Sequence, residues 1–111
     1  MSDQNLKSLK MLDQVLENEP GVLLYFSTPQ CNVCKVLRPK LMELFEQNYP
    51  EIGRYYIDST ETPEISGQYS VFAVPTIIIF LDGKEFARKS RNFSPAELVE
   101  EIRRPWEIMN S

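Results

Sequence analysis

Apolar residues along the chain alternate between a helical and an extended pattern. Over residues 3–18, leucines recur at spacings of three or four, which predicts a helix with one apolar face. Pro20-Gly21 interrupts this pattern, and residues 22–26 then form a continuous apolar run. A run of this length, with β-branched and aromatic side chains, is typical of a buried central strand.

A second helix is predicted over residues 31–48, and Pro39 inside it is expected to kink the backbone. The spacing of its apolar residues assigns the inward face to Val33, Val36, Leu37, Leu41, Leu44 and Phe45. Residues 54–58 predict a second strand, which should run parallel to the first because a helix connects the two.

The next segment combines turn signals with short apolar runs. Thr62-Pro63-Glu64 predicts the start of a short helix, with proline at the first helical position. Residues 76–81 predict another buried strand. Asp82-Gly83 predicts a two-residue hairpin, which leads to an edge strand over residues 84–89.

The last helix is expected to begin at the capping box Ser94-Pro95-Ala96-Glu97 and to end at Pro105. Helices between the early strands imply parallel pairing, whereas the closing hairpin implies antiparallel pairing. The pattern therefore predicts an α/β fold in which a four-stranded mixed β-sheet is flanked by helices on both faces. A chain of 111 residues fits one such unit, so we expect a single domain over residues 1–111.

Charge and hydropathy narrow the classes of function. The net charge is −4, with acidic and basic residues mixed along the chain, which argues against a nucleic-acid partner because such a partner needs a clustered basic face. The nearest basic cluster, Arg88, Lys89 and Arg91, is expected to be a solvated surface. No apolar stretch has the length of a signal peptide or a membrane span, so we expect a cytoplasmic protein with no membrane partner.

The two cysteines carry the candidate chemistry. Cys31 and Cys34 lie where the first predicted strand passes into a helix. Unpaired N–H groups and the helix dipole favour an anion in the first turn, so the pKa of the Cys31 thiol should be lowered. Cys34 lies one turn further along on the same side and should be less exposed. We therefore expect Cys31 to attack a substrate disulfide and Cys34 to resolve the mixed disulfide.

Other interpretations of a Cys-x-x-Cys pair remain open. Zinc usually needs four ligands, and the chain has no histidine and no third cysteine, so no single-chain metal site is expected. A metal shared between two chains is one alternative. A second is a binding module in which the dithiol acts only as a redox sensor, and a third is two buried cysteines without chemistry.

The chain resembles the thioredoxin family over residues 6–104. The residues that carry the resemblance, in order and spacing, are Phe26, Cys31-Asn32-Val33-Cys34-Lys35, Pro39, Asp58, Val74-Pro75-Thr76, Phe80 and Asp82-Gly83. The resemblance implies a thioredoxin fold and a thiol–disulfide oxidoreductase active in cell redox homeostasis. It also implies protein disulfides as substrates, an upstream reductant, no cofactor and a monomer.

The resemblance further assigns roles beside the dithiol. It implies that the Val74–Pro75 peptide bond is cis and that Pro75 packs against the two cysteines. Substrate backbone would bind along Ala73 and Val74 as an added strand. Gln30, which stands where typical members have tryptophan, would complete the substrate-binding residues.

Other positions also depart from the family pattern. Tyr25 replaces a buried acid, Arg54 corresponds to the lysine beside that acid, and Arg91 replaces a glycine near the last helix. An ordinary phenol has a pKa of about 10, so Tyr25 is expected to be a core aromatic and not a base. We therefore expect resolution by Cys34 to rely on water or on the departing thiolate.

Overall fold

The computed structural model describes residues 4–111, and its elements follow the predicted order closely. Two strands, over residues 76–81 and 84–89, have the predicted bounds, and the other predicted strands are one residue longer at one or both ends. The elements are β1 (Gln4–Asn5), α1 (Leu9–Asn18), β2 (Gly21–Ser27), α2 (Asn32–Asn48), β3 (Gly53–Asp58), α3 (Pro63–Gln68), β4 (Thr76–Leu81), β5 (Lys84–Lys89) and α4 (Pro95–Met109).

The sheet is mixed, with the strand order β1-β3-β2-β4-β5. As predicted, β3 runs parallel to β2, while β4 and β5 are antiparallel to their neighbours. The turn between β4 and β5 has positive φ at both Asp82 (55°) and Gly83 (77°), the combination that a type I′ hairpin requires. The two-residue hairpin is thereby confirmed.

The N-terminal segment differs from the prediction. The sheet has five strands and not four, because Gln4–Asn5 pairs with β3 and Leu6 N–H donates to the Tyr56 carbonyl at 2.9 Å. The first helix begins at Leu9, where the Ser8 side chain accepts a hydrogen bond from Met11 N–H at 3.1 Å. A two-residue polar strand has no alternation to detect, so only its pairing partner defines it. Residue 3, the predicted start of the helix, lies outside the described residues.

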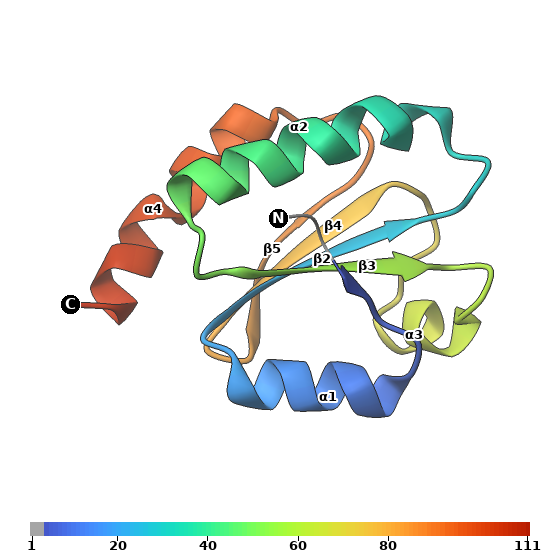
Figure 1. Ribbon diagram of the computed structural model, residues 1–111, viewed down its shortest axis with the longest axis horizontal. Coiled ribbons are helices and arrows are strands. Elements are labelled where there is room, and N and C mark those ends of the chain that lie inside the picture. The colour runs from blue at the N-terminus through green and yellow to red at the C-terminus, as the bar shows by residue number, and fades with distance from the viewer. Residues whose placement is uncertain (1–3) are drawn as a thin grey trace.

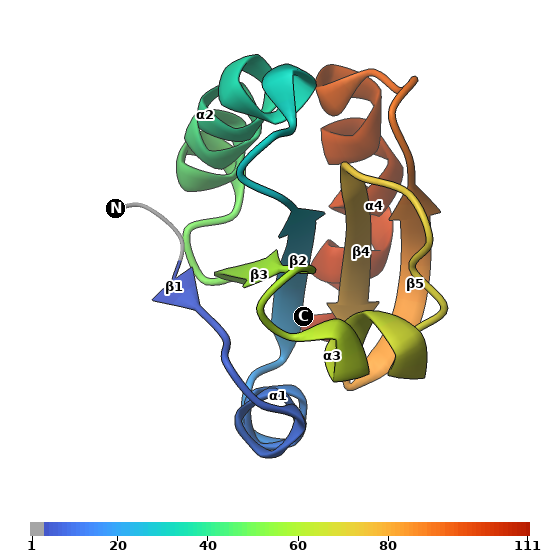
Figure 2. The same ribbon diagram turned by 90° about the vertical axis from the view of Figure 1, so that its right-hand side faces the viewer.

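Helices cover both faces of the sheet, as Figure 1 and the turned view in Figure 2 show. Successive side chains of β2 point to opposite faces. Leu23 and Tyr25 belong to the core beneath α2 and α4, whereas Val22, Leu24 and Phe26 belong to the core beneath α1 and α3. All five side chains are at most 1% exposed, so β2 is the buried central strand that the apolar run predicted.

The inward face of α2 matches the prediction at Leu41 and Phe45, and Leu37 and Leu44 pack against the same core, but the prediction was wrong for Val33 and Val36. Val33 and Val36 are 41% and 76% exposed, whereas Cys34, Leu41, Met42 and Phe45 are buried. The buried positions follow one another at helical spacing from Cys34, which therefore begins the inward face. This register turns the second cysteine toward the core and the valines toward solvent.

Pro105 does not end the last helix, which continues to Met109. Trp106 is only 8% exposed, and its ring meets that of Tyr49 edge-on with centroids 6.4 Å apart. Burial of this large side chain offsets the backbone hydrogen bond that proline removes. Within residues 4–111, no helix is long and apolar enough to cross a membrane.

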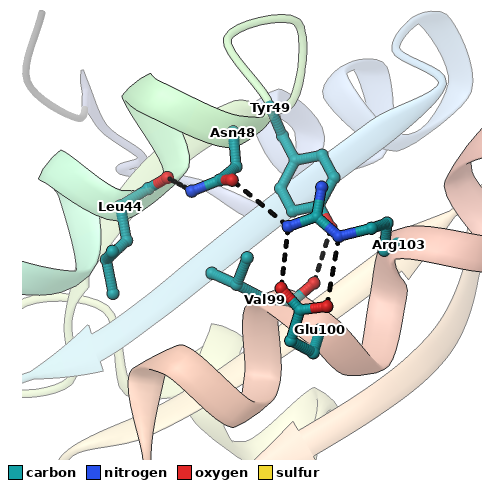
Figure 3. Close-up of polar contacts among 6 residues, drawn as sticks. All are labelled: Leu44, Asn48, Tyr49, Val99, Glu100 and Arg103. Atoms are coloured by element: carbon teal, nitrogen blue, oxygen red, sulfur yellow. Dashed lines mark hydrogen bonds and ion pairs between the residues drawn. The ribbon is translucent and has the colours of Figure 1, made fainter.

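Polar contacts join the C-terminal end of α2 to α4 (Figure 3). The Arg103 guanidinium donates to Asn48 Oδ1 at 3.2 Å and to both carboxylate oxygens of Glu100. Beneath it, the Tyr49 hydroxyl donates to the Val99 carbonyl at 2.5 Å. These contacts hold α2 against α4 at the end of α2 that lies away from the cysteines.

Candidate active site

The dithiol lies at the junction between the central strand and α2. Cys31 is the N-cap residue of α2, with extended backbone, and its Sγ accepts a hydrogen bond from Cys34 N–H at 3.3 Å. The two cysteines form a disulfide, with their Cα atoms 5.4 Å apart. The same sulfur that bonds to Cys34 therefore caps the helix.

The two sulfurs differ in exposure. Cys31 is half-buried, whereas Cys34 is 5% exposed and belongs to the core beneath α2 and α4. Cys31 lies at the N-terminus of α2, where the Cys34 N–H donates to its sulfur, and the N–H groups of a first helical turn together with the helix dipole favour a thiolate at such a position. In the reduced form, a more accessible first sulfur beside a buried second one is an arrangement suited to attack by the first and resolution by the second.

One hollow of about 350 Å³ adjoins both cysteines on the side of α2. It is lined by Ser27, Thr28, Pro29, Cys31, Cys34, Lys35, Arg38, Pro39 and Tyr56. Sequence reasoning did not assign Arg38 or Tyr56 to the site. The position of Arg38, four residues after Cys34, could have indicated it, because residues at this spacing lie on one side of a helix.

A second hollow of about 320 Å³ adjoins Cys31 on its other side. Its lining residues are Thr28, Gln30, Cys31, Asn32, Val33, Val74 and Arg91. Two of the predicted substrate-binding residues, Gln30 and Val74, thus share a surface with Cys31. The other two are not among its lining residues. Pro75 is buried, and Ala73 is exposed, with its carbonyl accepting a hydrogen bond from the Thr76 hydroxyl at 2.6 Å. The Val74–Pro75 bond is cis, as expected.

An aromatic column with a cation at its end lies beside the dithiol. Tyr25 is fully buried, which confirms it as a core aromatic, and its ring stacks on that of Tyr56 with centroids 6.4 Å apart. The Arg38 guanidinium lies over the Tyr56 ring, 3.9 Å from its centroid. The column places a cation, and not a buried carboxylate, at the wall of the first hollow.

Arg54 does not lie opposite Tyr25. The register of β2 and β3 pairs Tyr25 with Tyr56 and places Arg54 beside Leu23. The Arg54 guanidinium forms an ion pair with Glu46 of α2, with Nη1 and Oε1 3.3 Å apart. Arg54 is therefore already engaged and serves to hold β3 against α2.

Asp58 ends β3 at the same end of the sheet as the dithiol, since it pairs in register with Ser27. Its carboxylate accepts hydrogen bonds from the Thr60 hydroxyl at 2.6 Å and from the Thr60 N–H at 2.9 Å. The Thr60 hydroxyl, with further help from the N–H groups of Thr60 and Glu61, lowers the pKa of Asp58 below its ordinary value. The Asp58 carboxylate therefore bonds within the loop that follows β3.

Thr60→Val is expected to raise the pKa of Asp58 toward its ordinary value, because it removes the hydroxyl donor. A carboxyl whose pKa is lower in the folded state stabilises the protein above its unfolded pKa of about 4, and this stabilisation is lost as the pH falls through the folded pKa. The variant should thus be less stable at pH 7 by less than about 1 kcal/mol, since solvent screens the carboxylate, and equally stable in stronger acid.

NMR titration of the Asp58 carboxyl and urea unfolding at pH 7 and pH 3 measure the two effects. Thr60→Ser keeps the hydroxyl and is the matched control. An unchanged Asp58 titration in Thr60→Val would refute the assigned cause.

The described residues were also considered as metal ligands. Among residues 4–111, no group of three or more His, Cys, Asp or Glu side chains is placed to hold a metal ion.

Comparison with known proteins identifies the same architecture. The sequence model of the family described as Thioredoxin matches residues 4–104. A thioredoxin-like protein of Bacillus subtilis, YdfQ, is 30% identical over 103 residues, covering 93% of this chain and 91% of that protein. The thioredoxin of the same organism is 34% identical over 87 residues, 78% of this chain and 83% of the relative. A solved structure of a mutant Halobacterium salinarum thioredoxin superimposes with a TM-score of 0.82 and 25% identity, covering 93% of this chain and 89% of that chain.

Proposed function

Since the chain belongs to the thioredoxin family and is a thiol–disulfide oxidoreductase, we propose that it reduces protein disulfides, with Cys31 as the attacking and Cys34 as the resolving sulfur. One observation carries the assignment: Cys31 is a half-buried N-cap residue, whereas Cys34 is 5% exposed. Only the sulfur at the helix terminus is both accessible and stabilised as an anion.

The proposed reaction transfers two electrons from the reduced dithiol to the substrate. The Cys31 thiolate attacks one substrate sulfur, the substrate S–S bond breaks, and the other substrate sulfur leaves as a thiolate. Cys34 then loses its proton and attacks Cys31 Sγ, which releases the second substrate thiolate and forms the Cys31–Cys34 disulfide. The two substrate thiolates take up protons according to the pH, and an upstream dithiol reductant returns the protein to its reduced form.

Substrate binding is proposed on the surface that contains Gln30 and Val74. Both residues line the hollow beside Cys31, and Ala73, which is exposed, precedes Val74 in the loop before β4. An extended substrate segment along Ala73 and Val74 would bring its disulfide to Cys31 while cis Pro75 shapes the loop beneath. We propose that the protein acts as a monomer of one domain in the cytoplasm, where a reducing environment recharges such a dithiol.

The reduction potential of the Cys31–Cys34 couple tests the direction of the reaction. We expect a value more negative than about −200 mV, within the range of disulfide reductases. Equilibration with dithiothreitol buffers and quantification of alkylated cysteines measure it, and turnover with excess protein disulfide provides the second readout. A less negative potential indicates an oxidant or isomerase, and a single stoichiometric reaction without turnover indicates a redox-sensing binding module.

A further inference from the structure

The two hollows beside the dithiol differ in the sulfurs that they reach. Cys31 lines both, whereas Cys34 lines only the first, the hollow of about 350 Å³ on the side of α2. Cys34 is 5% exposed, so this hollow is the side from which a molecule can approach the second sulfur. The surface proposed for protein substrates, with Gln30 and Val74, belongs to the second hollow. The first hollow is therefore not used by the proposed reaction.

The first hollow has the size and the lining of a small-molecule site. Sites for small ligands have volumes of about 300–1,000 Å³ and combine apolar walls with a few polar groups. Pro29 and Pro39 supply apolar surface here, and Ser27 and Tyr56 supply hydroxyl groups. Ser27 is the last residue of β2, is 2% exposed and has a short side chain, which leaves the space beside the dithiol unfilled. A molecule of a few non-hydrogen atoms fits this space, whereas a folded protein cannot enter it.

The chemistry of disulfide exchange favours attack at Cys34. Exchange is faster when the departing sulfur is the more stable thiolate. Attack at Cys34 expels Cys31, whose sulfur lies at the N-terminus of α2 and accepts the Cys34 N–H at 3.3 Å. Attack at Cys31 expels Cys34, which belongs to the core, where burial disfavours the charged form. Limited access directs a large thiol to Cys31, but a compact thiol in the first hollow does not meet that restriction.

Building on the proposed function, in which Cys31 is the attacking thiolate, we propose that compact monothiols enter the first hollow and reduce the oxidised protein by attacking Cys34. This reaction is a second route of recharging beside the upstream dithiol reductant. It would make the protein responsive to small thiols that never contact the surface for protein substrates.

The proposed route has two exchange steps. A small thiolate forms a bond to Cys34 Sγ, the Cys31–Cys34 bond breaks, and Cys31 leaves as a thiolate. A second small thiolate attacks the outer sulfur of this mixed disulfide, which releases the small disulfide and the Cys34 thiolate. Two thiols thereby lose two electrons to the protein disulfide, and the two cysteines take up the protons that the thiols release.

The position of the first adduct tests the proposal directly. The oxidised protein is mixed with 2-mercaptoethanol, samples are quenched in acid with a thiol-blocking reagent, and mass mapping locates the hydroxyethylthio group. The two possible mixed disulfides interconvert through the free cysteine, so the ratio is extrapolated to zero time. We expect about fivefold more adduct on Cys34 than on Cys31, because Cys31 is the better leaving group.

Variants that fill the hollow locate the entrance. Ser27→Leu enlarges a buried side chain, and Lys35→Trp covers the hollow from an exposed position of α2, where it leaves the core intact. Each should lower the rate of reduction by 2-mercaptoethanol about tenfold. Lys35→Gln removes the charge but not the space, so it should lower the rate less than Lys35→Trp. Lys40→Trp is the matched control, because Lys40 is an exposed residue of α2 that lines neither hollow, and it should keep the natural rate.

The size of the thiol provides a second readout. Rates for 2-mercaptoethanol and for a short peptide with one central cysteine are each divided by the rate with an unhindered linear disulfide, which corrects for thiol reactivity. The corrected rate of the compact thiol should exceed that of the peptide about tenfold in the natural protein. This preference should fall severalfold in Ser27→Leu and Lys35→Trp.

The outcomes separate this inference from the proposed function. A first adduct mainly on Cys31, a corrected rate that is equal for the two thiols, or a rate that Lys40→Trp lowers as much as Lys35→Trp would overturn entry through the first hollow while leaving the reductase function standing. Turnover with a protein disulfide is measured on the natural protein in parallel. Its absence would overturn the proposed function, whatever the position of the small adduct.

Discussion

Cys34→Ser is expected to accumulate a covalent mixed disulfide with substrate protein, whereas Cys31→Ser forms none. The half-buried Cys31 at the helix terminus can attack without its partner, but the buried Cys34 cannot reach a substrate. Both variants should lose disulfide turnover, on the order of a thousandfold or more, because each lacks a sulfur that the reaction needs.

Non-reducing electrophoresis and mass mapping of the linked peptides measure the trapped species. Loss of activity in Cys31→Ser cannot be attributed to unfolding, because serine is among the best N-cap residues and replaces the sulfur that accepts the Cys34 N–H. The double variant Cys31→Ser/Cys34→Ser is the control for non-covalent capture. Recovery of mixed disulfides through Cys34 in the Cys31→Ser protein would reverse the assigned roles.

Tyr25→Asp is expected to lower the free energy of unfolding by on the order of 3–5 kcal/mol. The substitution removes a fully buried aromatic ring that stacks on Tyr56 and leaves a carboxyl in its place. Arg54 does not offset the buried charge, since it lies beside Leu23 and pairs with Glu46. Tyr25→Phe removes only the hydroxyl and should cost about 1 kcal/mol.

The pH dependence of Tyr25→Asp has a definite sign. Burial raises the pKa of the introduced carboxyl above its unfolded value of about 4, so the folded state binds the proton more tightly than the unfolded state. The loss of stability is therefore smallest below about pH 4 and grows as the pH rises toward the folded pKa. Urea unfolding between pH 3 and pH 8 measures it, and a deficit that does not change with pH would show that the carboxyl reaches solvent.

The same variant tests how Cys34 loses its proton. The natural sequence has a tyrosine where a buried acid stands in typical relatives. The rate of resolution of a preformed mixed disulfide should therefore show no pH dependence that reflects a carboxyl with a raised pKa. Tyr25→Asp should introduce one. Identical rate–pH profiles for the two proteins would mean that position 25 takes no part in the proton transfer.

Local sequence signals determined the features that short segments can encode alone. The apolar run at residues 22–26 specified a buried strand, because side chains that are apolar on both faces must be covered on both faces. Asp82-Gly83 specified the hairpin, since few other residue pairs adopt positive φ twice in succession. The dithiol could also be identified from a short segment, because its chemistry depends on two cysteines one helical turn apart at the junction between a strand and a helix.

Tertiary contacts decided what no local pattern specifies. Gln4–Asn5 is a strand only because β3 offers it a free edge, and α4 passes Pro105 because Trp106 is buried against Tyr49. The register of α2 against the sheet turned Cys34 inward and Val36 outward. Arg38 and Arg91, which lie 53 positions apart in the chain, flank one sulfur only in the folded protein. Packing between distant segments sets these features, because burial free energy depends on the surface that each side chain meets and not on its neighbours in sequence.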